Sequence, residues 1–336
     1  MKKRSFLPLL GIIFFVVLLF LSAEVSGARE MGIFFSFVAG LITFGTAYVL
    51  YFGTFFYASK RQTALQIFRA RWMRDVLMLS GLIGAVLGIT IMSTFAGSGS
   101  AEDLGAGMSA SLLAPLYGLL GAIGFYFIEK HLDMKKDGEQ MNSYPVKSGI
   151  NIRSMMSLVI LIIMFIFGIL LLTSAQMAFE LFLGLPIVYF VAAILIASIY
   201  IFDGKTVAQA LRFPFLRSNV DPFPPLKVVR GLKRIVSLMG LVAVSMTPIV
   251  IMATFGREEI TEKLFIPLGK TGVVLFWSMF ILFFLYLAEG QLVQQGYYKT
   301  GEIHYDDRFF LVKFVLPSFL ILFFSMWLVF LFYIFT

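Results

Sequence analysis

The sequence contains no cysteine, which excludes disulfides, thiolate nucleophiles and cysteine metal sites. Charged residues make up only 14% of the chain and hydrophobic ones 60%, whereas a soluble domain carries about a quarter charged residues. The two histidines, His131 and His304, lie far apart, so we expect solvated side chains and no metal or cofactor. Nucleotide-binding loops and nucleophile elbows are also lacking, and we expect no enzyme activity. These absences indicate an integral membrane protein.

Long apolar runs dominate what is present, and each is long enough to cross about 30 Å of hydrocarbon, which takes roughly 20 residues. Nine such runs cover residues 6–22, 32–57, 76–96, 105–128, 153–174, 179–202, 235–255, 266–288 and 309–335. We predict an all-α polytopic membrane protein with about nine transmembrane helices. The first run also resembles a secretory signal peptide, and we expect it to be retained as a helix.

Basic residues fall almost entirely on one side of these runs. Of the 27 lysines and arginines, 23 lie in residues 1–5, 58–75, 129–153, 203–234 and 289–313. The other side holds Arg29, Arg257, Lys263 and Lys270. The positive-inside rule therefore predicts a cytoplasmic N-terminus and an external C-terminus. The net charge of +8 follows from this asymmetry, and we expect no nucleic-acid partner.

Two of the basic segments suggest contacts outside the membrane core. Residues 58–75 can form an interfacial basic helix. Its predicted anchors are Ala64, Leu65, Ile67, Phe68 and Trp72. Residues 203–234 are rich in proline, which favours an extended path along a partner or the membrane surface, or a simple surface linker. The prolines are Pro214, Pro222, Pro224 and Pro225.

The order of helices and loops repeats along the chain. Aligning Ile89 with Ile249 places "ITIMSTF" (89–95) on "IVIMATF" (249–255) without a gap. The same alignment, continued without a gap, places Glu129 on Glu289, and we expect both to be solvated or interfacial charges at cytoplasmic helix ends. We predict two parallel four-helix units, residues 1–132 and 153–292, followed by an extra C-terminal transmembrane helix at 309–336.

Small residues line two consecutive spans of the first unit. The span at 76–96 carries Gly81, Gly84 and Gly88, and the next carries Ala110, Ala114, Gly118 and Ala122 at every fourth position. Small side chains let helix backbones approach closely in lipid. This pattern predicts a tight helix hairpin or tight packing against neighbouring subunits; generic membrane packing is the alternative.

The second unit keeps Gly240 but has Pro248 where the first has Gly88, and its last span is rich in Phe, Trp and Leu. Large side chains do not permit the same close approach. We expect this unit to face lipid or to buttress the first unit.

The stretches "GLIGAVLGITIMSTF" (81–95) and "GMSASLLAPLYGLLGAI" (107–123) resemble the two glycine-patterned helices of the MotA/TolQ/ExbB proton-channel family. The resemblance is specific over about residues 80–130 and weak in the second unit. It implies a subunit of a bacterial inner-membrane complex in which five such subunits ring two copies of a single-span partner of the MotB/TolR/ExbD kind. In that family an aspartate in the partner's span carries protons or sodium ions.

The sequence departs from the family at two positions where a threonine is frequent. Ala85 and Pro115 stand there, so hydroxyl groups thought to line the ion path are missing. Our candidates for an ion path or pore lining are Ala85, Thr90, Thr94, Ser111, Pro115 and Tyr117, although the hydroxyl groups can equally serve helix packing. No Asp or Glu lies deep within a predicted span, so ion transport needs a carboxylate from a partner.

Three functions remain open at this point. The first is an ion-driven motor or energising subunit that acts as a homo- or hetero-oligomer in the lipid bilayer. The second is a non-conducting scaffold or accessory subunit that kept the fold. The third is a small-solute transporter, which the parallel repeat and the lack of membrane-embedded charge argue against.

Overall fold

The computed structural model describes most of the chain. The described residues are 37–55, 63–95, 101–133, 149–172, 191–192, 194, 201–213, 215–217, 221–254, 260–300, 303, 314, 317–318 and 320–328. Their helices are α2 (Phe37–Gly40), the π-helical turn η3 (Leu41–Gly45), α3 (Thr46–Thr54), α4 (Thr63–Phe95), α5 (Ala101–Asp133), α6 (Ile152–Leu172), α9 (Gly204–Arg212), α10 (Phe223–Thr254) and α11 (Ile260–Thr300). The short strands β1 (Gly149–Ile150) and β2 (Leu216–Arg217) pair antiparallel.

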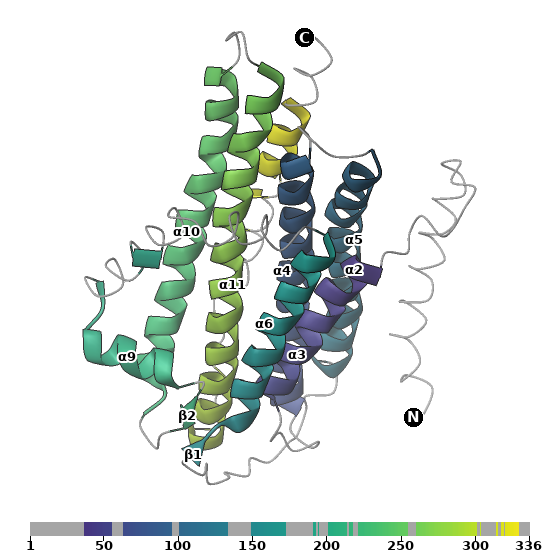
Figure 1. The fold of residues 1–336 in the computed structure, drawn as a ribbon. Coiled ribbons are helices and arrows are strands. Elements are labelled where there is room, and N and C mark those ends of the chain that lie inside the picture. The colour runs from purple at the N-terminus through teal and green to yellow at the C-terminus, as the bar shows by residue number, and fades with distance from the viewer. Residues whose placement is uncertain are drawn as a thin grey trace, which may run out of the picture.

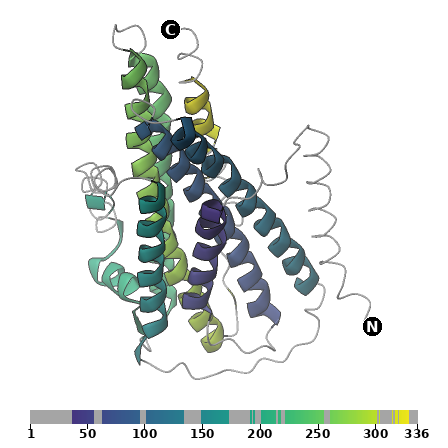
Figure 2. The ribbon, with the colours of Figure 1, turned by 45° about the vertical axis from the view of Figure 1, so that its right-hand side comes forward.

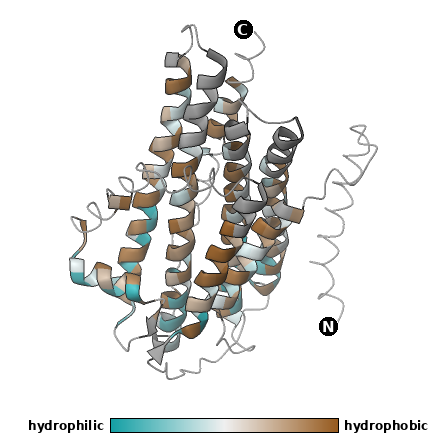
Figure 3. Cartoon of the chain, in the orientation of Figure 1, coloured by the Kyte–Doolittle hydropathy of each residue, from teal (hydrophilic) through white to brown (hydrophobic). Residues whose placement is uncertain are grey.

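Two long helix hairpins organise the fold (Figure 1). α4 packs along α5, and α10 packs along α11; α11 also packs against α4, so the two hairpins share one apolar core. α3 and α6 lie side by side across this core, as both views show (Figure 2). Hydrophilic residues gather at the end of the bundle that holds the β1–β2 pair (Figure 3).

Four helices in the described part of the chain are long and apolar enough to cross a membrane. These are Thr63–Thr90, Ser111–Asp133, Phe223–Met252 and Thr271–Tyr298, which coincide with the predicted spans at 76–96, 105–128, 235–255 and 266–288 over most of their length. The chain is therefore a multi-pass, predominantly helical membrane protein. Shorter apolar helices, Leu41–Thr54 and Ile152–Ile166, occupy the predicted spans at 32–57 and 153–174.

The remaining predicted spans are covered incompletely. The span at 6–22 and most of that at 179–202 lie outside the described residues. The described positions of the last span, Phe314, 317–318 and 320–328, are helical. The count of nine spans, the two units at 1–132 and 153–292 and the extra helix at 309–336 stay predictions.

The predicted interfacial helix at 58–75 is wrong in its placement. From Thr63 onward this segment is the first part of α4, which runs without a break to Phe95. Ala64 is half-buried, and the other four expected anchors are buried inside the protein, where α3 and α11 pack against α4. The Trp72 indole donates a hydrogen bond to the Tyr286 carbonyl over 3.0 Å, and its ring meets Phe55 edge-on with centroids 5.0 Å apart.

The predicted extended path of the proline-rich segment is wrong over most of the residues described, although β2 within it is extended. α9 begins this segment, and α10 begins at Phe223, so Pro224 and Pro225 lie in the first turn of a helix. A proline is tolerated there because N–H groups in the first turn have no partner within the helix. Pro222 directly precedes the helix, and Pro214 lies outside the described residues.

Candidate functional site

The α4–α5 contact brings the glycine-patterned residues together. A Cβ atom placed on Gly81 would lie 2.7 Å from the Ala114 carbonyl oxygen and 3.1 Å from the Gly118 Cα. A Cβ atom placed on Gly118 would lie 2.6 Å from the Leu77 carbonyl oxygen. The two backbones therefore touch directly, and only glycine fits at these points of closest approach.

The rest of the small-residue pattern continues this contact. Gly84 faces the Ala114 side chain, and Ala122 and Gly88 are buried. The side chain of Ala110 lies outside the described part of the chain. The membrane-crossing part of α4 is 83% buried, whereas that of α5 is only 28% buried. The accessible side of this hairpin is therefore on α5.

Two irregular helix segments lie against each other in this region: the part of α5 that contains Pro115 and the π-helical turn η3. The π-helical turn η3 lies against α5 there, and the buried Thr43 hydroxyl donates to the Ala114 carbonyl over 3.3 Å. The Phe44 and Tyr117 rings stack with centroids 5.9 Å apart. Proline removes a helical hydrogen bond from α5, and a π-turn shifts the bonding of the facing helix. Two locally weakened helix segments thus touch at one level of the bundle.

Two of the candidate ion-path residues on α4, Ala85 and Thr90, face different helices. Ala85 is fully buried one helical turn after Gly81, on the α5 side of α4. The Thr90 hydroxyl donates to the Val86 carbonyl over 2.7 Å, and this side chain packs against Gly272 of α11.

Three other candidates lie on α5. Ser111 is buried, while Pro115 and Tyr117 are half-buried. The side chain of Thr94 lies outside the described residues. The assignment of these residues to an ion path therefore stays a prediction.

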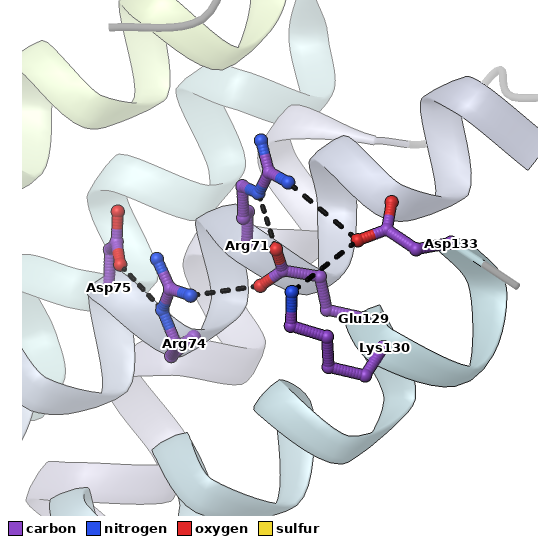
Figure 4. Close-up of polar contacts among 6 residues, drawn as sticks. All are labelled: Arg71, Arg74, Asp75, Glu129, Lys130 and Asp133. Carbon is purple, nitrogen blue, oxygen red and sulfur yellow. Dashed lines mark hydrogen bonds and ion pairs between the residues drawn. The ribbon is translucent and has the colours of Figure 1, made fainter. Parts of the chain in front are cut away.

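Buried ion pairs lie at the hydrophilic end of the α4–α5 hairpin (Figure 4). The two oxygens of Glu129 accept from Arg71 Nε at 2.6 Å and from Arg74 Nη1 at 2.8 Å. Glu129 is only 3% exposed, so the expectation of a solvated charge is wrong, while an interfacial position stays a prediction. An unpaired carboxylate is costly at this depth, and two arginines on one face of α4 neutralise it.

The α10–α11 hairpin contains the corresponding arrangement. Glu289 accepts from Arg230 Nε at 2.9 Å and from Lys233 Nζ at 2.5 Å. Glu289 is 5% exposed, so it is not solvated either, and it lies within α11, which continues to Thr300, and not at a helix end as expected. Lys233 Nζ also lies 4.2 Å from the centroid of the Tyr286 ring, a cation–π contact that lowers the cost of burying the ammonium group. We call these two groups of ion pairs the first and second carboxylate clamps.

Asp75 of α4 lies between the two clamps. Its carboxylate accepts from Arg74 Nε at 3.1 Å, and its charge also interacts with those of Lys233 and Glu289. The charged side chains of four helices therefore form one network. The sequence contains a signal for this network, since in both units two cations one helical turn apart precede a glutamate that ends the next apolar run.

A cluster of uncharged polar groups ties α3, α6 and α11 together near the same end. The Gln291 amide nitrogen donates to the Gly53 carbonyl at 3.1 Å and also to the Ser154 hydroxyl. The Ser154 hydroxyl in turn donates to the Gly53 carbonyl at 3.1 Å, and Asn151 donates to Ser154 at 2.6 Å. The sequence carries no signal for this cluster, because none of its members stands out from ordinary polar residues near a helix end.

A metal site is absent from the residues whose structure is described, since no three His, Asp or Glu side chains gather there. Comparison with protein families matches residues 61–143, which contain the whole α4–α5 hairpin, to the MotA/TolQ/ExbB proton channel family. Comparisons with curated proteins and with solved structures find no match.

Proposed function

On the premise that the chain belongs, through residues 61–143, to the MotA/TolQ/ExbB proton channel family, we propose that it is a subunit of an ion-driven energising complex in a bacterial inner membrane. The observation that carries this proposal is the backbone contact of Gly81 with Ala114 and Gly118, because the family match and this contact fall on the same hairpin. The complex couples a flow of protons or sodium ions to mechanical work.

The proposed partner is a single-span protein of the MotB/TolR/ExbD kind with a carboxylate in its span. The described spans support this requirement. Their innermost carboxylates, Asp75, Glu129 and Glu289, all lie at the hydrophilic end and are engaged with cations. An ion crossing the hydrocarbon needs an ionisable group along its path. The partner contributes that group, and the accessible side of α5 is where its helix docks.

One observation favours a second candidate, a non-conducting scaffold that kept the fold. α4 is enclosed by α5, α3 and α11, and Thr90 packs directly on Gly272. A partner helix therefore has no access to α4 within a single chain. In this alternative the hairpin serves assembly, and no ions pass along it.

The experiment is purification of the full chain from its native membrane, followed by reconstitution. We expect a single-span protein with a membrane aspartate to co-purify, and proteoliposomes holding both proteins to show proton or sodium flux. Changing the partner's aspartate to asparagine should abolish the flux, and vesicles holding the chain alone provide the background.

Co-purification without flux would support the scaffold and refute ion transport. If no such partner is found in a complex that remains intact through purification, the energising function is wrong.

A further inference from the structure

Arg69 lies on the side of α4 that faces away from the first clamp. Its guanidinium Nη2 donates to the Phe55 carbonyl at 3.3 Å, and its Cζ lies 5.3 Å from the centroid of the Phe55 ring. Its charge also interacts with the phenol groups of Tyr51, at the end of α3, and Tyr298, at the end of α11. Three helix ends thus converge on one half-buried arginine.

The charge of Arg69 lacks a carboxylate among the described residues. Arg71, Arg74 and Arg230 at the same end of the bundle each pair with a glutamate. Arg69 has instead a backbone carbonyl, an aromatic face and two phenols, and within the described part of the chain its buried Nε has no hydrogen-bond acceptor. Placing a cation in a half-buried site is costly unless an anion neutralises it.

The position of this arginine indicates where the anion comes from. Tyrosine concentrates at the boundary between hydrocarbon and headgroups, and the half-buried Tyr51 and Tyr298 lie beside Arg69. The neighbouring outer face of α3 exposes Tyr48 and Phe52, as expected of a surface in contact with lipid. Tyrosines of this kind indicate the depth of lipid headgroups, and the leaflet on this side, cytoplasmic by the positive-inside rule, is rich in anionic lipids.

We propose that Arg69, Tyr51 and Tyr298 form a binding site for the phosphate of an anionic phospholipid in the cytoplasmic leaflet. The planar guanidinium donates to phosphate oxygens, and the phenols supply neutral hydrogen-bond donors beside it. The lipid's acyl chains then run along the apolar outer face of α3. This site is separate from the α4–α5 contact and does not depend on ion transport.

The test uses the full chain in detergent. Phosphatidylglycerol, phosphatidylcholine or inorganic phosphate is titrated, and the unfolding temperature and the lipids retained in native mass spectrometry are measured. We expect phosphatidylglycerol to raise the unfolding temperature and to be retained, with phosphatidylcholine and free phosphate having little effect. R69Q should weaken phosphatidylglycerol binding about tenfold, the effect of losing one charge-assisted hydrogen bond.

Further variants separate binding from folding. Y298F keeps the ring and removes one donor, and R69K keeps the charge without the planar fork; both should bind phosphatidylglycerol more weakly than the wild type. R212Q, which removes an exposed arginine of α9 at the same end, should bind as the wild type does. Unchanged binding by R69Q, R69K and Y298F would overturn the proposal. An equal effect of phosphatidylcholine or of free phosphate would also overturn it.

Discussion

Glu129 and Glu289 occupy equivalent places in the two long hairpins of the bundle. Each ends a long apolar run and accepts from two cations one helical turn apart on the preceding helix, Arg71 and Arg74 in one hairpin and Arg230 and Lys233 in the other. The alignment that places Ile89 on Ile249 also superposes the two glutamates, whereas the cations of the second hairpin stand one position earlier than those of the first. This correspondence is what the predicted repeat of two four-helix units leads us to expect.

The first prediction concerns the carboxylate clamps. Glu129→Gln leaves Arg71 and Arg74 without their shared partner, and we expect a loss of roughly 2–4 kcal/mol in the free energy of unfolding. The arginines retain 14% and 21% exposure, which places the effect below that of a fully buried pair. Glu289→Gln should cost at least as much, because Lys233 is almost fully buried. Denaturant unfolding in detergent measures both.

Lys130 supplies the control for this prediction. It lies 3.9 Å from Asp133 in a pair that is 54% and 35% exposed, so Lys130→Gln should change the unfolding free energy by less than about 0.5 kcal/mol. If Glu129→Gln and Lys130→Gln prove equally mild, the first clamp does not stabilise the fold.

The second prediction concerns the closest approach of α4 and α5. Gly81→Ala introduces a methyl group against the Ala114 carbonyl, so the helices must separate, and we expect a loss of about 1–3 kcal/mol. Gly204→Ala is the matched control, because a Cβ there would have no neighbour within 4 Å. Thermal unfolding of both variants gives the comparison, and equal unfolding temperatures would contradict the direct backbone contact.

The third prediction concerns the contact between the two hairpins. Gly272→Ala drives a methyl group into the Thr90 side chain and should destabilise the protein by about 1–3 kcal/mol. Thr90→Ala removes the obstructing hydroxyl and methyl groups. The double variant should therefore recover at least half of the loss, a coupling that a double-mutant cycle measures. Strictly additive effects would show that these residues do not touch.

The fourth prediction concerns Trp72, whose indole joins α4 to α11. Trp72→Phe keeps an aromatic ring but removes the hydrogen bond to the Tyr286 carbonyl, and we expect a loss of about 1–2 kcal/mol. The fluorescence that the variant loses should be a component that a water-soluble quencher does not reach, since Trp72 is 3% exposed. If the lost component is readily quenched, this indole is in contact with water.

The contact between α4 and α5 could be predicted from the sequence, because small residues recur at helical spacing and therefore share one helix face. The carboxylate clamps could not be predicted from the sequence, because periodicity indicates which residues share a helix face but not which faces pack together. Pairing Arg71 with Glu129 requires knowing the register in which the two antiparallel helices pack. The prediction that segment 58–75 lies at the membrane surface is wrong for a related reason. Leu65 and Trp72 are apolar enough to face either lipid or protein, and in the structure they face protein.

The central position of α4 has a consequence for how the chain is made. α4 ends at Phe95, and α11, which covers it, begins only at Ile260. At about 5–20 residues per second, synthesis of the interval between them takes about 8–33 s. During this time the side of α4 that carries Thr90 has only lipid or an insertion factor beside it. The packing of α4 is thus complete only after α11 has been synthesised, so the first half of the protein cannot finish folding before the second half is made.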